Sequence, residues 1–360
     1  SILMELNLKD IGDFNNNYNK NPQFKISANA LARNNFKSIV INNKFVNDYN
    51  DVFKKVIDIE VKATNQAESG RCWMFAYLNI IRLKMIKMYN LEPDFELSQT
   101  YLFFYDKLEK ANYFLHYILG NLNEKPDSRK NLHLIREPIS DGGTTNMMFN
   151  LIKKYGILPK SNMKETFQSK SSSSINVLIN QRLRHAVNEL YENKKTRNNK
   201  FIKGVLSDIY TMLVIFLGEP PDKFSWEYYS KSDAKKNKKS KKGGENLRND
   251  INMKMLKNKS SKSNSSSKDN HKKYNIVKNI TPLDFYKKYS GFNVDNMITL
   301  INYPGKPINK LYNVESSNNM VNGMENNYVN VPIDLLKLLT KISIDDDCAV
   351  WFACDVGQYM

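Results

Sequence analysis

Apolar residues recur every three or four positions between Cys72 and Asn90, and this spacing constrains the fold more than any other feature of the chain. The recurring residues are Met74, Leu78, Ile81, Met85 and Met88. Side chains spaced in this way share one face of a helix, so the segment predicts a long helix that faces a core. Residues 175–191 and 201–217 repeat the pattern, the latter until Gly218, and another helix is predicted to begin at Pro332. We therefore expect a mainly helical chain.

The C-terminal residues predict a different element. Residues 349–356 are rich in β-branched and aromatic side chains and are followed by Gly357, which is typical of a buried strand. One strand at the end of a helical chain implies a sheet whose other strands lie beyond Met360. Helices followed by such a sheet favour an α+β fold.

The formal net charge of +17 comes largely from one segment. Residues 231–273 carry 15 Lys and Arg against four acidic residues, which leaves only +6 for the rest of the chain. Few apolar residues lie in this segment, so it cannot build a core and is predicted to be a disordered insert. Its basic run at 235–242 fits a nuclear-import or nucleic-acid patch, although a solvated tether is the commoner interpretation of such runs. A shorter serine-rich break is expected at 169–174.

Composition excludes several classes of protein. Of 360 residues, 41% are hydrophobic, which is enough for one large core or two smaller ones and excludes a wholly disordered chain. We find no secretory signal and no run of about 18 uncharged apolar residues, so we expect a soluble, cytoplasmic protein that does not associate with membranes. The three cysteines, Cys72, Cys348 and Cys354, are too few for a disulfide framework and lack metal-ligand spacing. We therefore expect neither a metal nor a cofactor.

The segment from Gln66 to Phe75 has the composition of a nucleophilic site. A thiol at Cys72, where a loop becomes a helix, faces unpaired N–H groups and the positive end of the helix dipole, which favour the thiolate. Gly70 permits a tight bend beside the sulfur. Gln66 lies six residues before Cys72, so its amide could return to the thiol and, with the Cys72 N–H, hold an oxyanion. The alternative is a cysteine buried at a helix start, but Gln, Gly and Trp at these offsets favour the nucleophile.

Several motifs in the chain resemble one known family. They are Thr64-Asn65-Gln66-x-x-Ser69-Gly70-Arg71-Cys72-Trp73, Leu97-Ser98-Gln99-x-Tyr101-Leu102-Phe103-Phe104-x-Asp106-Lys107, Asp141-Gly142-Gly143, Lys154-Tyr155-Gly156-x-x-Pro159-Lys160, Trp226-Glu227-Tyr228, Thr281-Pro282-Leu283-x-Phe285-Tyr286, Asn309-Lys310-Leu311-Tyr312 and Val350-Trp351-Phe352-x-Cys354-Asp355-Val356-Gly357. In this order they are similar to the bleomycin hydrolase and aminopeptidase C family of papain-like cysteine peptidases. The resemblance runs from about Asn65 to Gly357 and is interrupted by the lysine-rich insert.

The resemblance implies a role for each residue of the candidate site. Cys72 would be the nucleophile, Gln66 the oxyanion-hole donor, and Trp73 a packing and substrate-binding residue beside the thiol. Gly142 and Gly143 match the segment whose backbone pairs with the substrate chain, where a Cβ would obstruct approach. The alternative for these glycines is an ordinary turn, because Asp-Gly is a turn signal by itself.

The resemblance also implies a papain-like fold that ends before most of the right-hand β domain. The expected divisions are 1–71 for an N-terminal segment and oxyanion loop, 72–230 for a helical left-hand domain and helical insertion, 231–278 for the disordered insert, 279–348 for the rest of the helical insertion, and 349–360 for the first strand of the right-hand domain. The implied function is a cytosolic thiol aminopeptidase that trims peptide N-termini. Its expected partners are peptide substrates, further copies in a homo-hexamer, and nucleic acid bound weakly by a basic surface.

One part of the family pattern is missing. A thiolate peptidase needs an imidazole and a group, commonly Asn, that orients it, and in the family both follow the strand that resembles 349–356. None of the four histidines, His116, His133, His185 and His271, matches the family position. The main alternative is therefore a catalytically inactive peptidase-fold protein that binds nucleic acid or acts as a scaffold. A further alternative is an endopeptidase, if the tail that limits the family to end-trimming is absent.

Overall fold

The computed structural model describes residues 5–50, 52–57, 59, 61–230, 273–314 and 317–354. The chain divides into two compact units. One unit contains residues up to Val56 together with those from Phe352 on, and the other comprises Ile57–Trp351. The candidate site residues all lie in the second unit.

The described residues of the first unit form four helices, in which no residue is buried. They are α1 (Leu8–Asn19), α2 (Pro22–Leu31), α3 (Phe36–Val40) and α4 (Asn43–Asp48). An asparagine caps each helix, because its side-chain oxygen accepts from N–H groups of the first turn. At α1 the cap is reciprocal, since Asp10 also accepts from the N–H of Asn7. Local capping therefore explains where these helices begin.

The second unit contains the buried core and has both helices and strands. Its helices are α5 (Cys72–Tyr89), α6 (Gln99–Gly120), α7 (Arg129–Arg136), α8 (Thr145–Tyr155), α9 (Phe167–Lys170), α10 (Ser173–Glu192), α11 (Asn199–Leu217), α12 (Pro282–Tyr289) and α13 (Ile333–Asp345), with short 3-10 turns at Lys160–Asn162, Lys194–Thr196 and Val294–Asn296. Its strands are β1 (Phe224–Ser230), β2 (Lys273–Ile280), β3 (Leu300–Ile301), β4 (Lys310–Asn313) and β5 (Asn327–Asn330).

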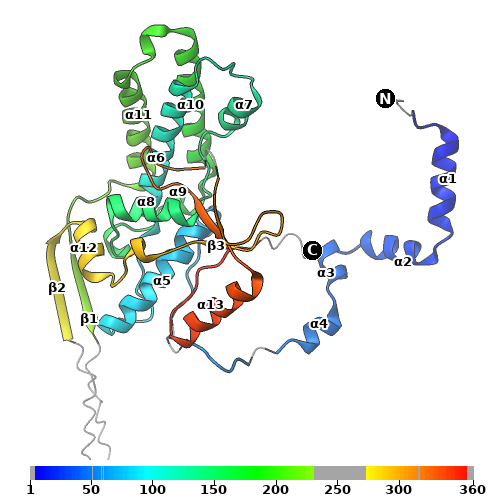
Figure 1. The fold of residues 1–360 in the computed structure, drawn as a ribbon, viewed down its shortest axis with the longest axis horizontal. Coiled ribbons are helices and arrows are strands. Elements are labelled where there is room, and N and C mark those ends of the chain that lie inside the picture. Colours follow the sequence, from blue (N-terminus) through cyan, green and yellow to red (C-terminus); the bar gives the residue numbers. More distant parts are fainter. Residues whose placement is uncertain are drawn as a thin grey trace, which may run out of the picture. The chain divides into compact units, whose positions relative to one another are not determined.

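Helices supply most of the core, with further residues from β1, β2 and α12. α5 packs against α6 and α8, and α6 also packs against α10 and α11, which run alongside it in Figure 1. Apolar side chains of α5 are buried on most of its circumference, so this helix is fixed from several sides. The helices predicted at 72–90, 175–191 and 201–217 are thus confirmed as α5, α10 and α11. The helix predicted from Pro332 is also confirmed, with Pro332 as the cap of α13.

The chain is mainly helical, as predicted, and five strands also lie among its described residues. β1 pairs antiparallel with β2, from Phe224 opposite Ile280 to Ser230 opposite Lys273. A second sheet has the order β3-β5-β4, with β3 parallel and β4 antiparallel to β5. The predicted boundary of the insert at 278 was wrong, because 273–278 belong to β2. The remainder of the predicted insert, 231–272, lies outside the described residues.

The strand predicted at 349–356 is not found: residues 349–354 form no strand, since no described strand lies beside them to supply hydrogen bonds, and 355–356 lie outside the described residues. The serine-rich break predicted at 169–174 contains the end of α9 and the start of α10, so it does separate two folded stretches. Ser169 and Ser172 are buried in it because their hydroxyls hydrogen-bond to carboxylates, Ser169 to Glu165 and Ser172 to Asp141.

Candidate active site

Cys72 is the first residue of α5, and its side chain is exposed. No side chain caps this helix, and the N–H groups of Met74 and Phe75 return to the carbonyl of Arg71 at 2.9 and 3.1 Å. The N–H groups ahead of them have no intrahelical acceptor, so the positive end of the helix dipole is open at the thiol. A developing negative charge beside Cys72 would meet these donors.

The loop before Cys72 is closed by its own hydrogen bonds. Gln66 Nε2 donates to the carbonyl of Ser69 at 2.7 Å, and Ser69 Oγ donates to the carbonyl of Gln66, also at 2.7 Å. Between them Ala67 has a φ of 52°, in the left-handed region that residues with a Cβ rarely adopt. The Gln66 amide was predicted to reach the thiol of Cys72, but it binds the backbone carbonyl of Ser69 in the loop. Among the described residues we find no hydrogen bond from Gln66 to Cys72. The second N–H of the amide remains to serve another acceptor.

A buried ion pair between Arg71 and Glu165 stabilises this loop. Arg71, which is fully buried, donates from Nη1 and Nη2 to the two carboxylate oxygens of Glu165 at 3.1 and 2.8 Å, and from Nε to Ser69 Oγ at 2.8 Å. Burial alone would raise the pKa of Glu165, but hydrogen bonds and charge from Arg71 hold it below the usual value. Such fork geometry fixes both partners in orientation as well as distance.

Trp73 packs against the segment 141–143. Its indole Nε1 donates to the carbonyl of Asp141 at 2.7 Å, and the residue is only 4% exposed. A Cβ added at Gly143 would lie 2.5 Å from two atoms of the indole ring, whereas one at Gly142 would meet nothing closer than Ser140 Oγ at 3.9 Å. The structure therefore brings Trp73 against Gly143, and the indole excludes a side chain at that glycine.

Two buried lysines one turn apart on α6 hold the segment 140–143. Lys107 Nζ lies 2.6 Å from Asp141 Oδ1. Lys110 Nζ donates to the carbonyls of Ser140 at 3.0 Å and Gly142 at 2.6 Å, and pairs with Asp106 at 2.7 Å. Burial lowers the pKa of Lys107 to about 8, with the attraction of Asp141 opposing the shift. Sequence reasoning missed these lysines as site residues, although two lysines inside an apolar helix were a signal.

The described histidines do not complete the site. His185 Nδ1 lies 3.4 Å from Glu189 on α10, His116 lines a shallow groove between α6 and α11, and His133 lies on α7. None of these three hydrogen-bonds to Cys72 in the described part of the chain, and His271 lies outside it.

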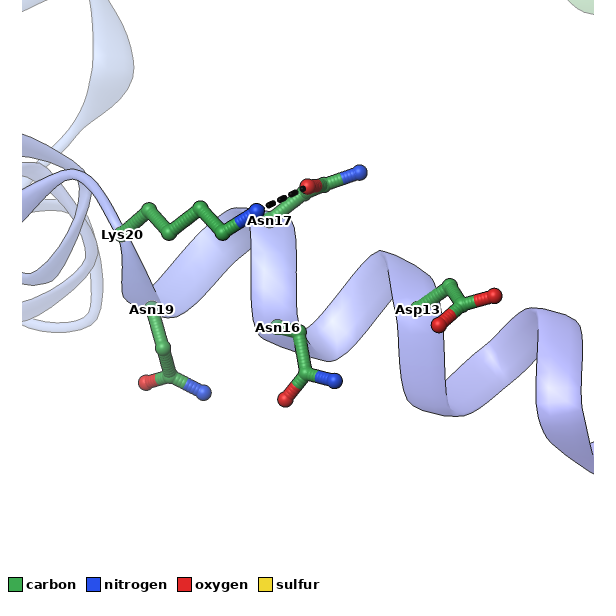
Figure 2. A pocket seen from close by; sticks show the side chains of 5 residues that line it. All are labelled: Asp13, Asn16, Asn17, Asn19 and Lys20. Atoms are coloured by element: carbon green, nitrogen blue, oxygen red, sulfur yellow. Dashed lines mark hydrogen bonds between the residues drawn. The ribbon is translucent and has the colours of Figure 1, made fainter.

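Other features of the described residues offer no competing site. A hollow along α1 is lined by exposed polar side chains (Figure 2). Lys20 turns back and donates to Asn17, while Asp13, Asn16 and Asn19 point outward. Within the described ranges no three His, Cys, Asp or Glu side chains gather where they could hold a metal ion. In the same residues, no helix is both long and apolar enough to cross a membrane.

Comparisons with known proteins agree on one family. The model of the Peptidase C1-like family matches residues 5–257 and 250–360. Aminopeptidase C of Listeria monocytogenes is 38% identical over 98% of this chain and 72% of its own, and human bleomycin hydrolase is 32% identical with the same coverage. The crystal structure of PepW from Lactobacillus rhamnosis matches with a TM-score of 0.82 and 32% identity, over 99% of this chain and 72% of that one.

Proposed function

Because the chain belongs to the Peptidase C1-like family, with relatives named aminopeptidase C and bleomycin hydrolase, we propose that it is a cytosolic thiol aminopeptidase acting through a Cys72 acyl-enzyme. One observation carries the proposal. Cys72 is an exposed thiol at the uncapped end of a buried helix, between the fixed loop 66–71 and the fixed segment 140–143. A nucleophile needs this combination of access and rigid surroundings.

In the proposed reaction the thiolate of Cys72 attacks the carbonyl carbon of the first peptide bond. A C–S bond forms while the π electron pair moves onto the carbonyl oxygen, which accepts hydrogen bonds from the Cys72 N–H and Gln66 Nε2. The C–N bond then breaks, and the amine leaves with a proton from an imidazolium. Water, giving a proton to the imidazole, attacks the thioester carbonyl, and the C–S bond breaks, which releases the N-terminal amino acid and returns the thiolate and the imidazolium.

The imidazole is proposed to come from outside the described residues. His116, His133 and His185 make no hydrogen bond to Cys72 in the described ranges, and the family carries its His and Asn after the segment that resembles 349–356. The proposal therefore takes both groups from residues outside the described ranges.

The remaining parts of the proposal concern substrate and assembly. Gly142 and Gly143 are proposed to bind the substrate backbone; Gly142 is exposed, and its carbonyl already accepts a hydrogen bond from Lys110. Family analogy suggests a homo-hexamer, and weak nucleic-acid binding is proposed for the basic segment of the sequence. Light scattering and a salt titration of DNA binding would measure these two properties.

The activity is tested with the full-length protein and aminoacyl-coumarin substrates. Cys72→Ser should reduce turnover at least about 10³-fold, because a hydroxyl without comparable activation is a poor nucleophile at neutral pH. Cys348→Ser is the matched control, since Cys348 is also an exposed free thiol, and it should leave the rate unchanged. An N-acetylated substrate should resist an aminopeptidase. Full turnover by Cys72→Ser would show that Cys72 is not the nucleophile, and no turnover by the wild type would favour the inactive scaffold.

A further inference from the structure

Four hydrogen-bond donors from separate parts of the chain converge on the carboxylate of Asp141. Oδ2 accepts from the N–H of Gly70 at 3.0 Å and from the hydroxyl of Ser172. Oδ1 accepts from Lys107 Nζ at 2.6 Å and from Asn176 Nδ2 at 2.7 Å. Both oxygens are therefore fully engaged, and every partner is a donor.

Only an ionised carboxylate satisfies this arrangement. An asparagine of the same shape has one acceptor oxygen, so its NH2 group would oppose two of the four donors. Burial alone would raise the pKa of Asp141, but the charge of Lys107 and the hydrogen bonds from Lys107, Ser172 and Gly70 hold it well below the usual range. The Lys107 side chain is fully buried, so removing its partner would leave an uncompensated charge.

The contacts of Asp141 lie on both sides of the candidate nucleophile in sequence. Gly70 precedes Cys72 by two residues, and Trp73, whose indole donates to the Asp141 carbonyl, follows it directly. A Cβ added at Gly70 would come within 2.7 Å of Asp141 Cβ, so the loop is in close contact with this side chain. One residue thus fixes the turn before the thiol, the ring after it and the start of the glycine segment.

We propose that Asp141 is a positioning residue for this reaction, holding the Gly70 turn and Trp73 so that the donors around Cys72 meet the oxyanion of the substrate. The inference rests on the proposed peptidase function. It predicts a split between two reactions of the same thiol. Amide hydrolysis develops an oxyanion, whereas alkylation by iodoacetamide does not, so only hydrolysis depends on those donors. Loss of one oxyanion-hole donor typically lowers turnover by about 10²–10³-fold.

The test must separate this role from a structural ion pair. Asp141→Asn leaves the buried Lys107 unpaired and is expected to be unstable, so the decisive variant is the double substitution Lys107→Met with Asp141→Asn, which removes both charges. The matched control is Glu109→Gln, because Glu109 is a buried carboxylate on α6 that pairs with Lys154 at 2.5 Å and also accepts a hydrogen bond from Tyr155, both at the end of α8.

All variants are made in the full-length protein and assayed where urea titration shows them folded. For the double variant we expect kcat for an aminoacyl-coumarin to fall at least about 30-fold, while the rate of Cys72 alkylation changes less than about threefold. Glu109→Gln should keep the wild-type ratio of the two rates. A folded double variant with the wild-type ratio would overturn the role of Asp141. If Cys72→Ser does not abolish hydrolysis, the proposed function itself fails.

Discussion

Replacing Gly143 by alanine should disturb the site through Trp73. The added Cβ would lie 2.5 Å from two ring atoms and 2.7 Å from a third, whereas carbon atoms pack at about 3.5–4.0 Å. One of the two groups must therefore move by about 1 Å. The indole cannot easily yield, because it is 4% exposed and its Nε1 is bound to the Asp141 carbonyl at 2.7 Å.

The expected destabilisation follows from these contacts. Overpacking of this kind costs about 1–3 kcal/mol, and loss of the indole hydrogen bond adds about 1 kcal/mol. We therefore expect Gly143→Ala to lower the free energy of unfolding by about 2–4 kcal/mol. Gly142→Ala is the matched control, since its Cβ would meet only Ser140 Oγ at 3.9 Å. It should change stability by less than about 1 kcal/mol, with a small gain expected from the lower entropy of the unfolded chain.

Urea titration of the full-length variants, followed by tryptophan fluorescence, measures both values. Peptidase activity should fall in Gly143→Ala under conditions where the variant is folded, because the ring beside the thiol is displaced. Equal stability of the two alanine variants would refute the packing argument. A fully active Gly143→Ala protein would show that the position of the Trp73 ring does not matter to the site.

Two further predictions follow from the same structure. Replacing residues 231–272 by Asn-Gly should keep activity on small substrates within about threefold. Ser230 already pairs with Lys273, and a two-residue turn can join these two residues. A loss of activity with the fold intact would place the segment in the site. The lowered pKa of Asp141 means that the unfolded chain binds its proton first as the pH falls, so this stabilisation is present above about pH 4 and is lost below it. In urea titrations from pH 5 to pH 3, the free energy of unfolding of the wild type should therefore fall relative to that of the Lys107→Met, Asp141→Asn protein. A constant difference between the two proteins would contradict the linkage.

Local periodicity was enough to predict the long helices but not the strands. α5, α10 and α11 each repeat apolar residues at helical spacing, so their buried faces are visible in the sequence. β1 alternates buried and exposed residues, yet its partner β2 lies more than 40 positions away across the lysine-rich segment. Pairing over that distance leaves no local signal, and the compositional boundary at 278 concealed the start of β2.

The candidate site was predictable only in part. The spacing of Gln66, Gly70 and Cys72 indicated a loop before a helix, and the structure has that loop. Asp141 appeared in the sequence as a turn residue beside two glycines. Its contacts with Gly70 and Lys107 depend on three segments meeting in space, so no spacing in the sequence could reveal them. At 349–354 the composition predicted a strand that the structure does not have, because a segment of strand composition forms no strand without a neighbouring strand to pair with.

The identity of the nucleophile is tested most directly by following alkylation and activity together. The full-length protein is treated with limiting iodoacetamide at pH 6, and mass spectrometry measures the labelled fraction of Cys72, Cys348 and Cys354, all three of which are free and exposed. Cys72 should be labelled first, since it lies at the open end of α5, and the fraction of activity lost should equal the fraction of Cys72 labelled. Equal labelling of the three thiols, or full activity with Cys72 alkylated, would contradict the account.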